Sequence, residues 1–227
     1  MNVIVFASRK GGTGKSTLVA HLAAHCDKAS GACVLIDADP QGSLTLWHGL
    51  RVREAPALRS GLREFGETIE TARREGAEWV LVDTPPLASE QVSEAIGAAT
   101  LIVIPARPAV FDLSAVTDTI GIARLARRPY AVVLNAVPPK RLGAEAPMVA
   151  WARRSLGALG APVWSGQVTQ RTNLATSLAD GGSVDGQSSE SRLAAEEIAG
   201  LWTAIQNSVK AIHGVYAGAA MHQQQAA

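Results

Sequence analysis

A glycine-rich loop near the start of the chain constrains its fold more than any other stretch. The loop, residues 9–17, reads Arg-Lys-Gly-Gly-Thr-Gly-Lys-Ser-Thr and lies between an apolar run, Val3–Ala7, and a helical pattern, Thr17–Lys28. A buried strand followed by such a loop and a helix is the context in which backbone N–H groups and a helix N-terminus bind phosphate. Glycines are needed because a Cβ would block the close approach of the phosphate. The sequence therefore predicts a phosphate-binding α/β unit.

The side chains around these glycines fit the phosphates of a nucleotide. Lys15 would reach the β- and γ-phosphates, Ser16 would ligate Mg²⁺, and Thr17 would bond the α-phosphate. A glycine-rich turn without a ligand is the alternative, but the lysines and the hydroxyl lie at the offsets that phosphate binding requires. The expected nucleotide-binding residues of the loop are Gly11, Gly12, Thr13, Gly14, Lys15, Ser16 and Thr17.

Apolar runs of strand length recur along the chain and alternate with helical segments. The runs are continuously apolar, which is typical of a parallel sheet covered on both faces. This alternation predicts a doubly wound, mostly parallel α/β sheet flanked by helices. The expected strands are Val3–Ala7, Cys33–Ile36, Val80–Val82, Leu101–Ile104 and Val132–Leu134, with Val163-Trp164 as a candidate sixth. The expected helices are Thr17–Lys28, Leu58–Glu75, Ser89–Ala98, Leu113–Ala126 and Pro147–Leu156.

Length and composition fit one domain. The 227 residues show no repeat and no convincing linker, so we expect a single domain over residues 1–217 and a disordered tail over 218–227, where periodicity is lost. The 21 basic and 20 acidic residues give a net charge of +1, which excludes a strongly basic protein but allows a local basic patch. Cys26 and Cys33 lack metal-like spacing and are expected to be reduced and buried.

Targeting signals are not evident in the sequence. Met1-Asn2 runs directly into a strand pattern, so we expect no signal peptide. No apolar run approaches the roughly 20 residues that cross a bilayer. We therefore expect a cytoplasmic protein.

Carboxylates follow two of the predicted strands. Asp37 and Asp39 end the second strand in the sequence Asp-Ala-Asp-Pro-Gln-Gly, and Asp83 ends the third in Asp-Thr-Pro-Pro. Open parallel sheets bind ligands at the carboxyl ends of their strands, so these side chains are expected beside the loop, where they would suit a cation or an attacking water. Turn formation by Asp-Pro is the alternative for the first motif.

The loop and the two acidic motifs, in this order, resemble the ParA/MinD family of deviant Walker A ATPases. The standard loop pattern has glycine at position 9, whereas this chain has Arg9 followed by the extra lysine, Lys10. The resemblance implies a P-loop NTPase fold, the cofactors ATP and Mg²⁺, and slow ATP hydrolysis that a partner stimulates. It implies that Lys10, Lys15 and Asp39 are catalytic, with Lys10 crossing an ATP-sandwich homodimer and Asp39 orienting the attacking water. It also implies that Ser16, Asp37 and Asp83 hold the metal.

Matches after residue 100 are looser. In the segment Pro105–Leu113 the resemblance implies a dimer face that carries Asp112, which could equally be a helix N-cap. Asn135 matches an adenine contact and could equally be a turn residue before two prolines. The segment after Thr169 resembles small, ParF-like partition proteins and implies that Arg171 binds DNA nonspecifically. A basic face could be completed by Lys140, Arg141, Arg153 and Arg154, although ordinary solvated charges are the alternative.

A final helix is expected over about Arg192–Tyr216, with Ile198, Leu201, Trp202, Ile205, Val209 and Ile212 at helical spacing. A MinD-like membrane helix would need Lys and Arg on its polar face, where this segment carries Glu196 and Glu197, so core packing is expected. His21 and His25 lack the intervening Glu of a zinc motif.

The resemblance implies an ATP-dependent dimer that binds nucleoid DNA and releases it when a centromere-binding or cargo-adaptor protein stimulates hydrolysis. Plasmid or chromosome partition and the positioning of another cargo remain open. A MinD-like membrane ATPase is the main alternative. Relatives of the nitrogenase iron protein or of bacterial tyrosine kinases are disfavoured, because cluster cysteines after the second acidic motif and a tyrosine-rich tail are missing.

Overall fold

The computed structural model describes residues 1–30, 32–60, 65–86, 89–184 and 189–225. A six-stranded, wholly parallel sheet forms the centre, in the order β3-β2-β4-β1-β5-β6. The strands are β1 (Asn2–Phe6), β2 (Cys33–Asp37), β3 (Ala57–Ser60), β4 (Trp79–Asp83), β5 (Leu101–Ala106) and β6 (Tyr130–Leu134). The helices are α1 (Lys15–Ser30), α2 (Ser43–Gly49), α3 (Phe65–Arg74), α4 (Glu90–Ala98), α5 (Val110–Leu125), α6 (Pro147–Ala158), α7 (Thr172–Thr176) and α8 (Ser189–Gln225). The predicted doubly wound α/β class is confirmed.

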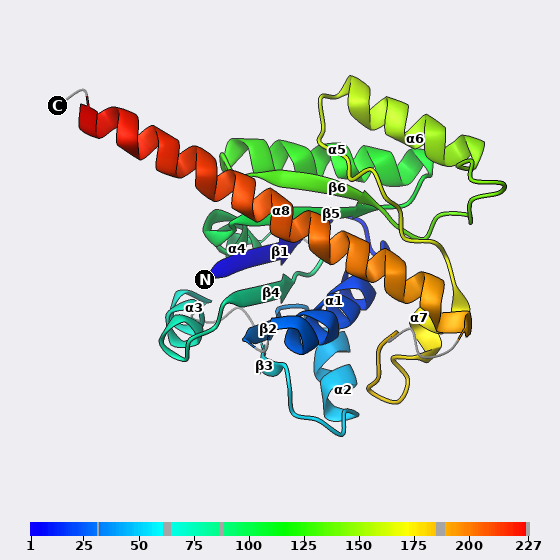
Figure 1. Cartoon of the computed structure of the whole chain (residues 1–227), viewed down its shortest axis with the longest axis horizontal. Helices are drawn as coiled ribbons and strands as arrows, with labels where there is room; N and C mark the ends of the chain where they lie inside the picture. Colours follow the sequence, from blue (N-terminus) through cyan, green and yellow to red (C-terminus); the bar gives the residue numbers. More distant parts are fainter. Residues whose placement is uncertain (31, 61–64, 87–88, 185–188, 226–227) are drawn as a thin grey trace.

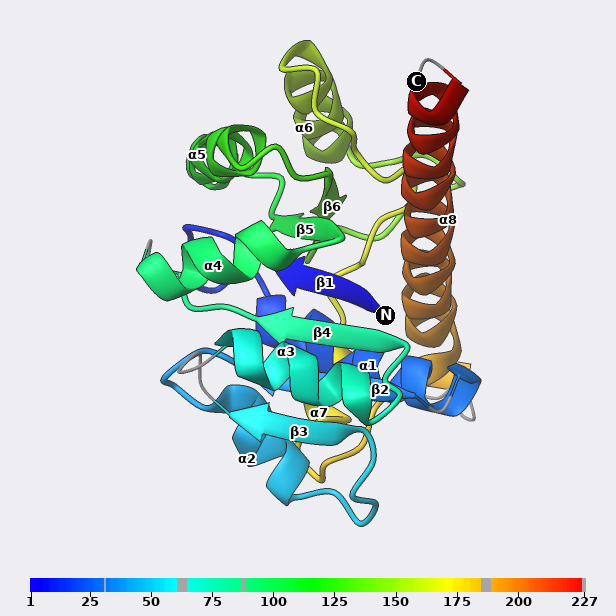
Figure 2. The ribbon, with the colours of Figure 1, turned by 90° about the vertical axis from the view of Figure 1, so that its left-hand side faces the viewer.

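Helices cover both faces of the sheet, so successive strand residues enter two different cores. In β1, Val3 and Val5 pack with α3, α4, α5 and α6, whereas Ile4 and Phe6 pack with α1, α2, α7 and α8. Figure 2 shows α5 and α8 on opposite sides of the strands. Burial on both faces explains why the central strands read as continuous apolar runs.

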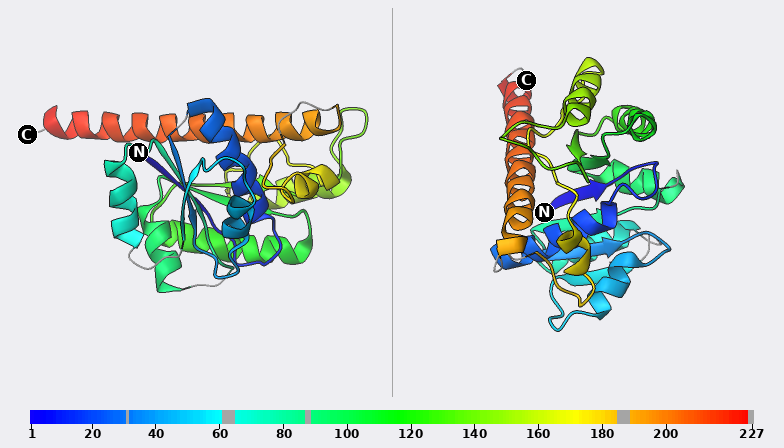
Figure 3. Two further views of the ribbon diagram at one scale, coloured as in Figure 1. Left: turned by 90° about the horizontal axis from the view of Figure 1, so that it is seen from below. Right: turned by 90° about the vertical axis from the view of Figure 1, so that its right-hand side faces the viewer.

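The C-terminal helix α8 crosses one whole face of the sheet. Its residues Ile198, Leu201, Trp202, Ile205 and Val209 are buried, so the predicted core packing is confirmed. Trp202 meets Trp79 of β4 edge to face, with 4.7 Å between ring centroids. The far end of the helix projects beyond the rest of the molecule (Figures 1 and 3).

The end of α8 overlaps the tail that the sequence predicts to be disordered. The structure continues the helix to Gln225, past Gly218, where the sequence predicts disorder, and residues 226 and 227 lie outside the described part. The domain boundary at residue 217 stays a prediction. Cys26 and Cys33 are buried, as expected.

One predicted helix is wrong at its start. The segment Leu58–Glu75 was expected to be helical throughout, but Ala57–Ser60 forms the edge strand β3, which pairs with β2, and the helix begins at Phe65. The candidate strand at Val163-Trp164 contributes a single parallel bridge, from Val163 to Val132. Being at an edge and partly exposed, β3 lacks the continuous apolar signal of the central strands.

Candidate functional site

The glycine-rich loop connects β1, at the centre of the sheet, to the N-terminus of α1. Gly14 has a φ of +87°, and a Cβ on it would lie 2.3 Å from Nδ2 of Asn135. Glycine is therefore required at this position by both backbone conformation and space. The first residue of α1 is Lys15, so the positive end of the helix dipole lies at the loop, as expected for phosphate binding.

The loop is tied to the end of β6 by Asn135. This buried side chain donates a 2.7 Å hydrogen bond from Nδ2 to the carbonyl oxygen of Thr13. The amide nitrogen predicted to contact adenine therefore holds the loop in this structure. Ala136, the next residue, has a φ of +51°, so the backbone turns sharply after Asn135.

Lys15 is buried against the acidic ends of the neighbouring strands. Burial lowers the pKa of Lys15 below its usual value, and the neighbouring carboxylates of Asp83 and Asp39 act in the opposite direction. A lysine in this environment loses much of its hydration and gains from any additional anion, such as a phosphate.

Asp83 ends β4 and is fully buried, with Asp37 of β2 opposite it in the sheet register. Neither carboxylate oxygen of Asp83 forms a hydrogen bond with any described residue. Burial raises the pKa of Asp83 to about 7, although the Ser16 hydroxyl and the Lys15 ammonium nearby lower it. A buried carboxylate without a bonding partner is costly unless a cation or water completes it.

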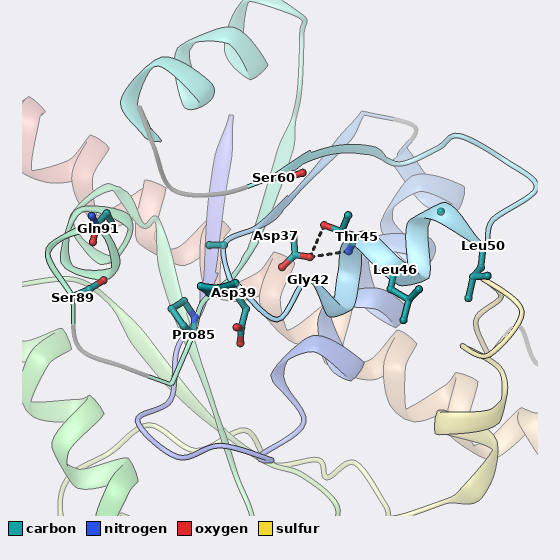
Figure 4. A pocket seen from close by; sticks show the side chains of 13 residues that line it. Asp37, Asp39, Gly42, Thr45, Leu46, Leu50, Ser60, Pro85, Ser89 and Gln91 are labelled. Carbon is teal, nitrogen blue, oxygen red and sulfur yellow. Dashed lines mark hydrogen bonds between the residues drawn. The ribbon is translucent and has the colours of Figure 1, made fainter.

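Asp37 and Asp39 point in different directions (Figure 4). Oδ2 of Asp37 accepts hydrogen bonds of 2.7 Å from both the backbone N–H and the hydroxyl of Thr45, while Oδ1 has no partner among the described residues. Oδ1 of Asp39 accepts a 3.0 Å bond from the Gln41 N–H, which shapes the turn into α2. Asp37 is thus anchored to α2, and Asp39 projects into the open site.

These observations fit a bound Mg²⁺ and nucleotide. Three carboxylate oxygens, two on Asp83 and one on Asp37, are buried and without partners, and Ser16 lies at the start of α1. In the described ranges, no group of three or more His, Cys, Asp or Glu side chains could hold a metal by itself. Mg²⁺ characteristically takes few protein ligands and completes its shell with water and phosphate oxygens.

Two neighbouring pockets open at this edge of the sheet. One, of about 790 Å³, lies between the glycine-rich loop, α2 and α7, and its lining includes Lys15 and Asp39. The other, of about 960 Å³, lies beside α2 and includes Asp37, Leu46 and Leu50 (Figure 4). Asp39 lines both pockets, so it lies between the loop and the second cavity.

Arg107 was missed by the sequence analysis as a site residue. It is exposed, follows the end of β5 and lines the pocket at the loop. Its Nη2 lies 3.8 Å from where a Cβ on Gly12 would be. Its place just after a strand, at the carboxyl edge of the sheet, was the signal that could have identified it.

The proposed DNA-binding residues fall into two groups. Lys140, Arg141 and Arg154 are exposed, as a phosphate contact requires. Arg153 is instead bound to Glu145 and to the backbone carbonyls of residues 164–166, so in this structure it clamps α6 to the following loop. Arg171 is only 20% exposed and pairs with Glu197 at 2.7 Å, so the structure gives it an internal partner.

Lys10 and Asp112 complete the predicted residues. Lys10 is exposed at the tip of the loop, next to Arg9. Asp112 is not an N-cap, because α5 begins at Val110 with Ala109 as its cap residue; Asp112 lies within the first turn. There its negative charge faces the positive end of the helix dipole.

Comparisons with known proteins agree with this geometry. The profile of the CobQ/CobB/MinD/ParA nucleotide-binding domain matches residues 4–184. The chain is 30% identical over 205 residues to the maintenance of carboxysome distribution protein A of Halothiobacillus neapolitanus, covering 86% of this chain and 92% of the relative. It is 35% identical over 116 residues to Protein ParA of Rhizobium radiobacter, covering 49% of this chain and 51% of the relative.

Solved structures share the fold at low identity. Apo McdA of Cyanothece aligns with a TM-score of 0.73 at 18% identity, over 92% of this chain and 99% of that one. MinD of Aquifex aeolicus, in its complex with MinC, aligns with a TM-score of 0.67 at 21% identity, over 88% and 96%. The predicted ParF-like subgroup stays a prediction.

Proposed function

This chain belongs to the CobQ/CobB/MinD/ParA nucleotide-binding family and is a ParA-family ATPase, and we propose that it works as an ATP-dependent dimerisation switch. The ATP-bound dimer binds nucleoid DNA without sequence preference, and a partner protein triggers hydrolysis and release. One observation carries the proposal: buried Lys15 lies beside the buried, unpartnered carboxylate of Asp83 at the end of the glycine-rich loop.

Each residue of the site has a role in this proposal. The loop N–H groups and Lys15 bind the phosphates, while Ser16, Asp37 and Asp83 hold Mg²⁺. The metal, when bound, supplies positive charge against the transferring phosphoryl group. Asp39 orients the attacking water, because it is the carboxylate that projects into the open site.

Slow turnover by a single subunit follows from the same arrangement. Asp37 is bonded to Thr45, and Asp37 and buried Asp83 are both assigned to the metal, so neither carboxylate is free to orient the water. Asp39 alone can meet the water, and phosphoryl transfer depends chiefly on positioned charge rather than on a base. Lys10 supplies further charge across the dimer, and the partner protein completes the arrangement.

The cargo is open between two kinds named by the relatives. The maintenance of carboxysome distribution protein A of Halothiobacillus neapolitanus is named for carboxysome distribution. Protein ParA of Rhizobium radiobacter and the chromosome-partitioning ATPase Soj of Thermus thermophilus are named for partition. We propose positioning of a cellular cargo or of DNA, in the cytoplasm and on the nucleoid, through a cognate adaptor.

The membrane-surface alternative is disfavoured by α8. No helix in the described ranges is long and apolar enough to cross a membrane. The apolar residues of α8 from Ile198 to Val209 are buried against the sheet, so they are not available to lie in a lipid surface.

Two variants test the site with ATP binding and turnover as separate measurements. Lys15→Ala should abolish ATP binding, and Asp39→Ala should bind ATP but lose hydrolysis. Asp118→Ala, on the exposed part of α5, is the matched control and should change neither. Undiminished ATP binding by Lys15→Ala would refute the loop assignment, and normal turnover by Asp39→Ala would remove Asp39 from the mechanism.

A further inference from the structure

The end of α5 and the turn before β6 carry three arginines in five residues: Arg124, Arg127 and Arg128. All three are exposed. Within the described residues, the side chains of Arg127 and Arg128 form no hydrogen bond or ion pair. Arg124 bonds the Tyr130 hydroxyl and the carbonyl oxygen of Leu159, which joins this arginine turn (residues 124–128) to the end of α6.

Arg127 occupies a backbone position that favours glycine. Its φ is +52°, in the left-handed region. The Arg127 N–H bonds the carbonyl of Arg124 at 3.0 Å, and the Arg128 N–H bonds that of Ala123 at 3.0 Å. This bond pair is the Schellman motif, whose left-handed residue is usually glycine because a side chain is strained there.

Two other helices of the same chain end with this motif and use glycine. At the end of α3, Gly76 has a φ of +82° and bonds the carbonyl of Arg73. At the end of α6, Gly160 has a φ of +63° and bonds the carbonyl of Gly157. The chain thus accepts strain at Arg127 that it avoids at two equivalent positions.

Helix capping by charge does not account for this choice. A cation near a helix C-terminus is stabilising. However, α3 carries Arg73 and Arg74 in its last turn and still ends in Gly76. Arg124 already provides such a charge to α5. Strain retained at an exposed residue points to a use for the side chain itself.

The surroundings of the turn are positive. Residues 119–139 contain three cations, Arg124, Arg127 and Arg128, and no Asp or Glu, in a chain whose net charge is only +1. Guanidinium groups bind phosphate through paired N–H donors. A lipid surface would need an amphipathic face, and although Leu125 is exposed, the apolar residues Val116, Ile120 and Ala123 of α5 are buried.

We propose that the arginine turn is the phosphate-backbone contact through which the chain binds duplex DNA. This inference rests on the proposed function and names its DNA surface, in place of the residues predicted from the sequence. Arg153 and Arg171 have internal partners, and Lys140 and Arg141 follow β6 at the carboxyl ends of the strands, where two copies would meet. The turn precedes β6 and so lies at the amino ends of the strands, opposite the nucleotide pockets. It therefore remains open when two copies meet across the nucleotide edge.

The test measures retention on random-sequence duplex DNA at fixed moderate salt, with ATP, ADP or no nucleotide. Wild type should be retained with ATP. The double variant Arg127→Gly/Arg128→Gln should bind at least about tenfold more weakly, and the slope of log affinity against log salt should fall by roughly one for each phosphate contact removed. Lys140→Gln/Arg141→Gln, at the carboxyl end of β6, is the matched charge control and should bind nearly as wild type.

Unfolding cannot produce the expected loss, because Arg127→Gly relieves strain and should leave the Tm unchanged or raise it by roughly 2–4 °C. Wild-type binding by the double variant, with loss in Lys140→Gln/Arg141→Gln, would overturn the inference and leave the proposed switch intact. Failure of wild type to bind DNA while it still binds ATP would overturn both DNA assignments. Retention on vesicles of anionic phospholipid instead would assign the arginine turn to a membrane and overturn the inference.

Discussion

At the scale of single residues, the site contains a buried carboxylate, Asp83, whose charged form is unfavourable in the nucleotide-free protein. Asp83 is buried and neither of its oxygens has a hydrogen-bond partner among the described residues, and burial raises its pKa to about 7. An unfolded aspartate ionises near pH 3.9. Asp83 therefore lowers the free energy of unfolding of the nucleotide-free protein at any pH above about 4. In that range the carboxyl group is ionised in the unfolded chain, whereas burial in the folded chain favours its protonated form.

Asp83→Asn should stabilise the nucleotide-free protein by between about 2 and 4 kcal/mol at pH 8. The folded pKa is raised, so wild-type stability is lost as the pH rises from about 4 to about 7, and the difference between the proteins should grow over that window and then level off. Urea unfolding at several pH values measures it, with Asp118→Asn as the exposed control. The variant should also lose the stabilisation that ATP with Mg²⁺ gives wild type. A variant less stable than wild type at every pH would contradict the account.

Site residues that strand order alone brings together could be predicted from the sequence, whereas residues whose partners are brought near only by folding could not. The loop and the three aspartates were predictable because strand order alone brings them to one edge of the sheet. Arg153 and Arg171 were not, because their partners, Glu145 and Glu197, are acidic residues that only the folded chain brings near. The bond from Asn135 to Thr13 likewise spans 122 residues.

At the scale of elements, His21 joins three segments on the α8 face of the sheet. From α1, its buried ring bonds the carbonyl oxygen of Leu174 in α7 at 2.9 Å and accepts the Val184 N–H at 3.3 Å. The ring must be neutral to do both, with its proton on Nε2. Ala175 of α7 lines the pocket at the loop, so this connection steadies one wall of the nucleotide site.

His21→Gln should make the protein less sensitive to acid. Burial lowers the pKa of His21, so its contribution to stability is complete above about pH 6.5 and is lost as the pH falls below that value. Wild type should lose about 1 kcal/mol more than the variant between pH 7 and pH 5, roughly the value of the Val184 bond. Thermal unfolding across this range measures the difference, with the exposed His213→Gln as control. Parallel pH profiles for wild type and His21→Gln would rule out the connection.

Element prediction succeeded in proportion to burial. The central strands β1, β2, β4 and β5 are buried on both faces and were predicted within one or two residues. The edge strand β3 is partly exposed throughout, and its short sequence merges with the amphipathic pattern of α3, so the sequence predicts helix there.

At the scale of the whole molecule, the strand order gathers the functional groups at one edge. β1 lies between β4 and β5, where the direction of winding changes, so the loop after β1 meets Asp83 on one side and Arg107 on the other. Lys10 is exposed at this edge, where a second copy would bring its own nucleotide. The proposed dimer would thus bury the site and leave the arginine turn free.

Dimerisation should depend on Lys10. In the Asp39→Ala background with ATP and Mg²⁺, light scattering should give about twice the monomer mass of 23.6 kDa, and the added Lys10→Ala change should return it to the monomer. Lys28→Ala, at the other end of α1, should leave the dimer intact. If the Lys10→Ala protein remained a dimer, or if the dimer formed without nucleotide, dimerisation would not depend on ATP and Lys10, and the prediction would be wrong.

The path of α8 determines when one apolar face of the sheet is covered during synthesis. Ile4 and Phe6 leave the ribosome well before α8, the helix that helps to cover their face of the sheet. Until then a broad apolar surface is exposed in the nascent chain, which is a state prone to aggregation and to capture by chaperones. A ribosome that stalls late in translation should therefore cause more aggregation of this protein than its βα units, which form locally and rapidly, would suggest.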